Sequence, residues 1–493
     1  MKSKIYFIIL FIFLHNIINA KETLKDILKE HLIELNYTTI RYSKVYPWLK
    51  ELGEEYQQYG IILNSNTVLS QCDELIHSVS INAIYKNKKY KLQLELIDTE
   101  VNLCILKSNQ SFLNFKKNWK ELPLGEDPKL KQNIKVFYFD DYNQLRYYKY
   151  SVNEYTITSD YGFTKLPVFT VSSSKSIKIG SPAVLNEEVV GFHSYYNDKK
   201  LIFVPASRIR YFINQYFSEN YKGFVVQGLE LKPVFDELKK HYNLPEDEQG
   251  CFVEEIIIGS SGYGILKEGD IILEIDGIKP NKKCFYKDPL MGYQKFELLI
   301  SRNINGTYRN KGEKLKVQIL RDKQVKKLEI DLKSLYNYNR SVERIPWKVY
   351  GMQPYILQHG ILFIELSRSY LIERLGKNWR RQALELAYLY DNKKYYKNEK
   401  EQDKIVIISE VLPDPINIGY QDILLKPVLK ANNIDIQNLK HLYQIIDKTI
   451  HSHNKILELE LSNHRKIYID LNKEKEHLNI LKKFYIPSDH YLP

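Results

Sequence analysis

Residues 266–277 read Leu-Lys-Glu-Gly-Asp-Ile-Ile-Leu-Glu-Ile-Asp-Gly and are the most specific stretch of this chain. A Gly-Asp pair opens an apolar run that predicts a strand, and an Asp-Gly pair closes it, as in tight turns between strands. A helix over 292–301 and a strand over 314–321 are predicted to follow. We expect these elements to form one compact module over residues 224–336.

The residues before this module have a different pattern. Short apolar runs broken by turn residues extend from about 32 to 217, which favours a β-barrel or sandwich. Helical spacing of apolar residues over 206–220 closes this region. The runs are Tyr59–Leu63, Ser80–Tyr85, Tyr90–Ile97, Asn102–Leu106, Val136–Phe139 and Val189–His193.

The residues after the module repeat its plan less clearly, over 345–493. Ile405–Val411 predicts a strand, and Tyr420–Leu424 stands where Gly-Asp-Ile-Ile-Leu stood before. Val428–Asn433 then supplies a strand and a turn. The Lys- and Tyr-rich segment 388–404 is expected to be a solvated helix end or loop, as charge runs usually are.

Composition excludes several function classes. The 493 residues are 44% hydrophobic and 27% charged, which is globular composition with length for about three domains. The net charge of +12 comes from scattered basic residues, without a zinc-finger spacing or an aromatic RNA-binding strand. We therefore expect no nucleic-acid partner. No His/Cys cluster has metal-ligand spacing, so we expect neither a metal nor a cofactor.

The first twenty residues predict a cleaved signal peptide. Lys2 and Lys4 precede the apolar run Ile5–Leu14, and Ala20 offers a small residue at the cleavage point. The rival interpretation is a transmembrane anchor, but such a span needs about twenty apolar residues. We expect an exported protein without a transmembrane anchor, in the periplasm, outside the cell or on its surface.

The order of these features resembles the HtrA/Deg-type serine proteases, in the branch that has a trypsin-like domain and two PDZ domains. The resemblance implies a mainly β fold with α/β modules. After the signal peptide at 1–20, it implies a trypsin-like double β-barrel at 21–220, a PDZ domain at 224–336 and a degenerate PDZ-like domain at 345–493. It rests on Pro47-Trp48, Leu122–Gly125, Val189–Phe192, Phe203–Pro205 and Ile416–Tyr420.

The resemblance also locates the three catalytic positions. Asp73 stands where the family has histidine, Asn102 where it has aspartate, and Ile179 where it has the nucleophilic serine. Acyl transfer needs an oxygen nucleophile, an imidazole base and a carboxylate that orients the imidazole. Since all three are replaced, we predict a non-catalytic homologue that binds polypeptides or partner proteins.

Two alternatives stay open. The first is an active endopeptidase with a relocated site. Against it stands the simpler interpretation that the serines of such a site are turn and surface residues. The second is a surface adhesin or another partner-binding protein. The relocated site would use Ser181, Ser172, Ser173, Ser174 or Ser176 as nucleophile and His77 or His193 as base.

The four cysteines divide between two of the predicted domains. An oxidising compartment would permit two bridges, and the alternative is four buried thiols. The resemblance places Cys72 and Cys104 near two of the replaced catalytic positions, on neighbouring strands. A disulfide between them is our hypothesis. Cys251 and Cys284 are the other pair.

A PDZ domain binds a peptide as an added strand and receives its carboxylate in a loop of backbone amides. The resemblance implies that Gly250, Cys251 and Phe252 match this loop and that 252–258 is the edge strand. Phe296 and Ile300 would line the groove, unless they belong to the core. The expected partners are polypeptide C-termini or unfolded segments, and the family implies a homo-oligomer, a trimer or a multiple.

Overall fold

The computed structural model describes residues 23–51, 53–72, 75–112, 121–158, 164–245, 248–257, 259–336, 351–392 and 404–492. The chain divides into two compact units, Met1–Thr38 with Glu55–Asn337, and Thr39–Glu54 with Tyr338–Pro493. The predicted signal peptide lies outside the described residues. Within them, no helix has the length and apolar character to cross a membrane.

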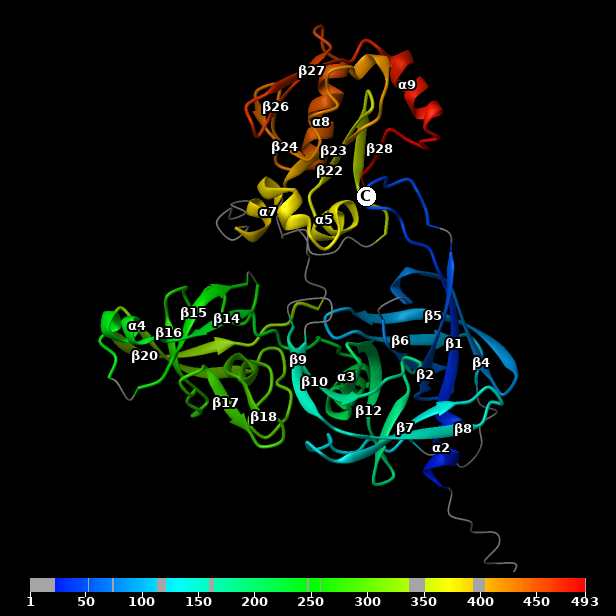
Figure 1. The fold of residues 1–493 in the computed structure, drawn as a ribbon, viewed down its shortest axis with the longest axis vertical. Helices are drawn as coiled ribbons and strands as arrows, with labels where there is room; N and C mark the ends of the chain where they lie inside the picture. Colours follow the sequence, from blue (N-terminus) through cyan, green and yellow to red (C-terminus); the bar gives the residue numbers. More distant parts are fainter. Residues whose placement is uncertain are drawn as a thin grey trace, which may run out of the picture. The chain divides into compact units, whose positions relative to one another are not determined.

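The first unit begins with a helix and a closed barrel, drawn in blue in Figure 1. Strand β1 alternates buried and half-buried side chains, so Leu35 and Tyr37 enter the core while their neighbours do not. The strands lie in the order β1-β2-β3-β6-β5-β4. The elements are α2 (Leu24–His31), β1 (Leu32–Thr39), β2 (Glu54–Ile62), β3 (Thr67–Ser70), η1 (Leu75–His77), β4 (Ser78–Tyr85), β5 (Lys88–Asp98) and β6 (Leu103–Ser108).

A seven-stranded sheet follows in the order β8-β7-β11-β12-β13-β10-β9. Phe169 and Phe203 face each other in register on β10 and β13, and their rings stack at 5.0 Å in the core. The predicted helix is α3, which buries Ile209 and Phe212. The elements are β7 (Asn133–Phe139), β8 (Leu145–Ser151), β9 (Glu154–Thr158), β10 (Leu166–Ser172), β11 (Pro182–Leu185), β12 (Glu188–Asn197), β13 (Lys200–Pro205) and α3 (Ala206–Phe217).

The module around 266–277 closes the first unit with a five-stranded sheet, β14-β15-β16-β19-β20. The predicted strand at 314–321 is confirmed as β19. The helix expected over 292–301 is wrong in its first half, because Gly292–Lys295 pairs with Phe285–Asp288 in a hairpin. The elements are β14 (Leu229–Pro233), α4 (Asp236–Tyr242), β15 (Cys251–Ile256), β16 (Ile271–Ile275), β17 (Phe285–Asp288), β18 (Gly292–Lys295), η2 (Phe296–Ile300), β19 (Lys314–Arg321) and β20 (Gln324–Asp331).

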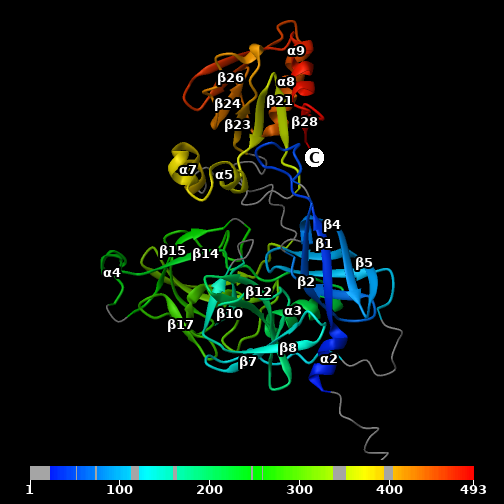
Figure 2. The same cartoon turned by 45° about the vertical axis from the view of Figure 1, so that its right-hand side comes forward.

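The second unit has one larger sheet with helices packed on it, as Figure 2 shows for α8 and α9. The strand order is β27-β26-β24-β23-β22-β21-β28, and β25 pairs with β24. The elements are β21 (Tyr355–Gln358), β22 (Ile361–Glu365), α5 (Arg368–Leu375), α6 (Trp379–Gln382), α7 (Leu384–Asp391), β23 (Val406–Val411), η4 (Pro415–Asn417), β24 (Lys426–Ala431), β25 (Ile434–Asp435), α8 (Leu439–Ile450), β26 (Ile456–Leu461), β27 (Lys466–Asp470), α9 (Glu474–Lys483) and β28 (His490–Tyr491).

Candidate functional site

Ile179 lies in the turn that leads into β11, at the predicted nucleophile position. Its backbone oxygen accepts a hydrogen bond from the Tyr59 amide at 2.8 Å. The next residue, Gly180, has φ +83°, and a Cβ there would lie 2.3 Å from the Tyr59 carbonyl oxygen. Only glycine fits this combination of conformation and close approach. The turn is therefore tightly built, but its central side chain is aliphatic and offers no nucleophilic atom.

Ser181 and His193 are the nearest hydroxyl and imidazole to this turn. The Ser181 hydroxyl donates to the Lys178 carbonyl oxygen at 2.7 Å, and His193 Nδ1 lies 3.3 Å from the same oxygen. The other ring nitrogen of His193 is buried with no hydrogen-bond partner. Both side chains are at most 1% exposed. The serine and the histidine thus share an acceptor and are not bonded to each other.

Burial sets the protonation state of His193. Removal from water disfavours the charged imidazolium and lowers the pKa of His193 to about 4, although the Lys178 carbonyl works against this. A general base is most effective when its pKa lies near the working pH. His193 is neutral at pH 7, but solvent and substrate do not reach it.

Of the other serines of the relocated-site alternative, Ser172 ends β10 and the rest follow it. Ser172, Ser174 and Ser176 are exposed, and the Ser173 hydroxyl donates to the Lys175 carbonyl oxygen at 2.7 Å. This is the behaviour of turn residues. His77 ends the short helix η1.

Asn102, at the predicted aspartate position, lies at one end of the β3–β6 strand pair. Asn102 directly precedes β6 and has φ +55°, a left-handed conformation that asparagine tolerates better than most residues. Asp73 lies outside the described residues. Ser70 pairs with Cys104 in antiparallel register. The residues just after Ser70 and just before Cys104 therefore lie at the same end of the strand pair.

A buried acidic pair a few residues before Asn102 was missed by sequence reasoning. Asp98 is 1% exposed and accepts a hydrogen bond from the Tyr221 hydroxyl at 2.5 Å. Burial raises the pKa of Asp98 to about 7. The Glu100 carboxylate accepts from both the amide and the hydroxyl of Thr164 at 3.0 Å. Aspartate and glutamate in a turn are usually exposed to solvent, so nothing in the sequence indicated that Asp98 and Glu100 are buried.

Only one of the two bridges that the sequence permits is formed. Cys72 and Cys104 are free, buried thiols, so the bridge expected between them is absent from the structure. Their sulfurs approach different acceptors, the carbonyl oxygens of Asp98 and Ser70 respectively. Burial raises the pKa of the Cys72 thiol well above its usual value. The described residues hold no cluster that could bind a metal ion.

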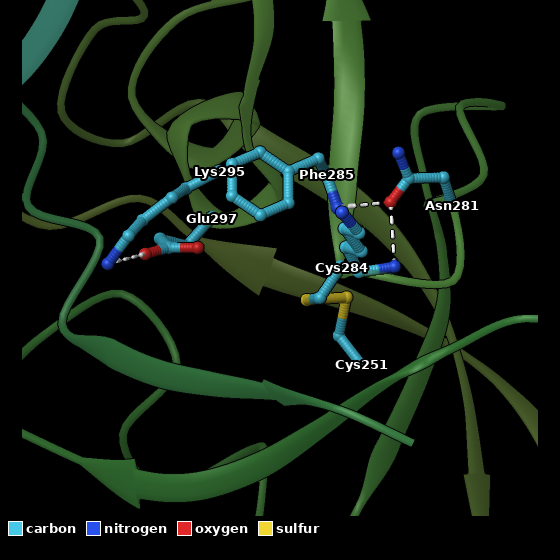
Figure 3. Close-up of a disulfide and its surroundings, with 7 residues drawn as sticks. Cys251, Asn281, Cys284, Phe285, Lys295 and Glu297 are labelled. Atoms are coloured by element: carbon cyan, nitrogen blue, oxygen red, sulfur yellow. Dashed lines mark hydrogen bonds and ion pairs between the residues drawn. A yellow bond between two sulfur atoms is a disulfide. The ribbon is translucent and has the colours of Figure 1, made fainter. Parts of the chain in front are cut away.

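Cys251 and Cys284 form a disulfide inside the module with the five-stranded sheet, with Cα atoms 5.3 Å apart (Figure 3). The Asn281 side chain accepts a hydrogen bond from the Phe285 amide at 3.0 Å and shapes the turn that presents Cys284. The bridge ties β15 to the segment before β17. Cys251 therefore has a structural role in the core.

The expected peptide-binding edge at 252–258 is wrong. Strand β15 pairs with β14 on one side and with β16 on the other, so its backbone groups at Cys251 and Phe252 are already used. Gly250 is packed so that a Cβ would lie 2.4 Å from the Ile271 side chain. Phe296 and Ile300 are 0% and 2% exposed and belong to the core.

Strand β14 is the actual edge of this sheet, and no strand of the described residues pairs with its outer side. The side chain of Gln227, just before it, bonds to the backbone of Lys165 through both its oxygen (3.0 Å) and its nitrogen (2.6 Å). The Lys165 ammonium group lies 3.1 Å from Glu230 and 4.0 Å from Glu297. This edge is thus rimmed by charged and polar groups.

The corresponding edge of the second unit is occupied. Strand β22 pairs with β23 on one side and with β21 on the other, and β21 also pairs with β28. Helix α8 contacts both β21 and β22. Strand β21 therefore already occupies the place between β22 and α8 where a peptide strand would bind.

The described residues thus contain a closed barrel, a seven-stranded sheet, a five-stranded module and, in the second unit, a larger sheet with helices. A family model described as a PDZ domain matches residues 345–491. Protease Do-like 4, mitochondrial, of Arabidopsis thaliana is 24% identical over 479 residues, which cover 90% of this chain and 82% of that protein.

Two further likenesses are more limited in extent. A serine protease DegP homolog of Plasmodium falciparum is 30% identical over 232 residues, 45% of this chain and 22% of that protein. The solved HtrA-type protease AlgW with decapeptide is 13% identical, with a TM-score of 0.43 over 63% of this chain and 98% of that one. The near full-length similarity to Do-like proteases and the PDZ match together support a relationship to the HtrA/Deg-type protease family.

Proposed function

We propose that this protein is an exported, non-catalytic member of the HtrA/Deg family that binds polypeptide segments through its first PDZ-like module. The observation that carries the first part is the turn at Ile179, where a glycine-dependent backbone presents an aliphatic side chain. Acyl transfer cannot begin without an attacking atom. Backbone amides alone would leave only modest rate enhancement over water.

The binding part of the proposal rests on strand β14. A peptide that adds to a sheet edge needs unpaired backbone groups, and β14 has such an edge. Lys165 and Glu230 stand close to this edge and would contact polar or charged side chains of the peptide. In the second unit the corresponding edge is taken by β21, so we assign recognition to the first module.

Export is supported by two separate features. The first is the predicted signal peptide. The second is the disulfide between Cys251 and Cys284, since such bridges persist in oxidising compartments and are rare in the cytosol.

The test of inactivity is incubation with unfolded casein and with a fluorophosphonate probe, beside an active HtrA protease as positive control. We expect no cleavage and no labelled serine. Labelling would overturn the proposal, and Ser181→Ala would then show whether Ser181 is the nucleophile.

The test of binding is a peptide array with free and amidated C-termini. We expect captured peptides to lose affinity when the free carboxylate is removed. Binding that ignores the carboxylate, or no binding at all, would contradict the PDZ part of the proposal.

A further inference from the structure

The segment Thr39–Glu54, here called the strap, connects strands β1 and β2 of the barrel, yet it packs as part of the second unit. The chain therefore passes between the two units after Thr38, after Glu54 and after Asn337. The first two of these passages, after Thr38 and after Glu54, are the two ends of the strap. In Figure 1 its dark blue trace lies beside the strands of the second unit.

The strap is held in shape by its own hydrogen bonds. Tyr42 and Lys50 form a β-bridge, and the Ser43 amide donates to the Leu49 carbonyl oxygen at 3.0 Å. The Ser43 hydroxyl oxygen accepts from the amides of Val45 and Tyr46 at 3.1 and 3.0 Å. A segment that is already folded loses little conformational entropy when it docks.

Two carboxylates of the second unit anchor the strap. Glu373 on α5 accepts hydrogen bonds from the Ser43 hydroxyl at 2.7 Å and from the Lys44 amide at 2.8 Å. Glu410 on β23 accepts from the Tyr46 hydroxyl at 3.1 Å and also pairs with Arg374. Hydrogen bonds to an ionised acceptor are stronger than those between neutral groups.

Apolar contacts complete the docking. Val45 is 6% exposed and belongs to the same core cluster as Tyr355 and Leu371. The ring of Trp48 lies 5.5 Å from the ring of Tyr355. Leu49 points away and is 50% exposed. The strap thus supplies a buried side chain to a core that is otherwise built from residues beyond 350.

We infer that α5, β21 and β23 form a binding site for the strap of the same chain, and that the strap is a clasp that holds the second unit to the barrel. The linker 337–350 would then not be the sole connection between the units. This inference concerns the assembly of the chain and is independent of the proposed function.

The test is to place a specific protease site between Asn337 and Tyr338 in the full chain and to cleave it. If the strap is a clasp, the two fragments stay together in size-exclusion chromatography, and Val45→Asp separates them. Leu49→Asp, on the exposed side of the strap, is the matched control and leaves them together. Fragments that separate without substitution, or stay together with Val45→Asp, would overturn the inference.

A milder variant covers the case in which Val45→Asp fails to fold. Glu373→Gln keeps the shape of an exposed side chain but removes the charge from the anchor. We expect about tenfold weaker association of the cleaved fragments, because two charge-assisted hydrogen bonds become neutral ones. Unchanged association would count against the clasp.

The identity of the docked copy is tested with cysteines at Ser43 and Glu373, linked by a short bismaleimide in the full chain. A cross-link within one chain supports the inference. A cross-link between two chains would show that the strap of a second copy occupies the site, and would overturn it.

Discussion

The Ser181 hydroxyl and the His193 imidazole both bond to the carbonyl oxygen of Lys178, at 2.7 and 3.3 Å. In a working serine hydrolase the hydroxyl bonds to the imidazole, which takes its proton. Here a backbone oxygen stands between the two groups, and both are shielded from solvent. The arrangement stabilises the turn before β11 and gives no route to a serine alkoxide.

Ser181→Ala is therefore expected to alter stability and not peptidase activity. Loss of one intramolecular hydrogen bond costs about 1 kcal/mol of unfolding free energy. Denaturant unfolding measures this cost, and casein turnover measures activity. Hydrolysis by the parent chain that disappears in the variant would contradict the structural role.

We expect the burial of His193 to lower the free energy of unfolding at acidic pH. Its folded pKa of about 4 lies below the unfolded value of about 6.5, so protonation favours the unfolded chain. The contribution is complete above pH 6.5 and is lost as the pH falls towards 4. Its full size is about 3 kcal/mol, from 1.36 kcal/mol per pKa unit. Unfolding free energies of the parent and His193→Gln are compared across this range, and a constant difference would refute the assignment.

For Asp98 we expect the opposite pH dependence of the free energy of unfolding. Its folded pKa of about 7 lies above the model value of 3.8, so the neutral carboxyl favours the fold. This contribution is present below pH 3.8 and is lost as the pH rises through 7. The difference in unfolding free energy between the parent and Asp98→Asn should change by about 4 kcal/mol over that interval. Because His193 acts in the opposite direction, each variant is compared with the parent at every pH.

The disulfide predicts a local loss of stability on reduction. Cys251 and Cys284 close a loop with a sequence separation of 33 residues, for which chain entropy gives about 4 kcal/mol. Cys251→Ala with Cys284→Ala should lower the free energy of unfolding of the module with the five-stranded sheet by up to this amount. Hydrogen exchange of β15 and β16 reports it, with barrel strand β6 as internal control. Equal exchange with and without the bridge would contradict the prediction.

The fold was predictable because it depends on patterns that repeat along the chain. Alternating strands, the Gly-Asp and Asp-Gly turns around β16 and the helical spacing of α3 each act locally. The half-helix error at Gly292 has a local cause as well. Gly292 has φ +75° and continues a hairpin, which apolar spacing does not reveal.

The candidate site was harder to predict, since it depends on pairing between distant segments. Gly250, Cys251 and Phe252 look like an edge in the sequence, but the order of strands in the sheet decides which strand is free. The choice between two cysteine pairs has the same origin, because it depends on Cα separation. Likewise, the pKa of Asp98 is raised only when the fold buries the carboxyl, and the hydrogen bond from Tyr221 works against this rise.

Gly180 has one more consequence. Its left-handed backbone, pressed against the Tyr59 carbonyl, maintains the turn without help from any reactive group. Placing serine at 179 would thus present a hydroxyl on an intact scaffold, while aspartate and asparagine still stand at the other two predicted catalytic positions. Under the proposed function, hydrolysis would require coordinated replacements at Asp73, Asn102 and Ile179, and any one of them alone should leave the chain inert.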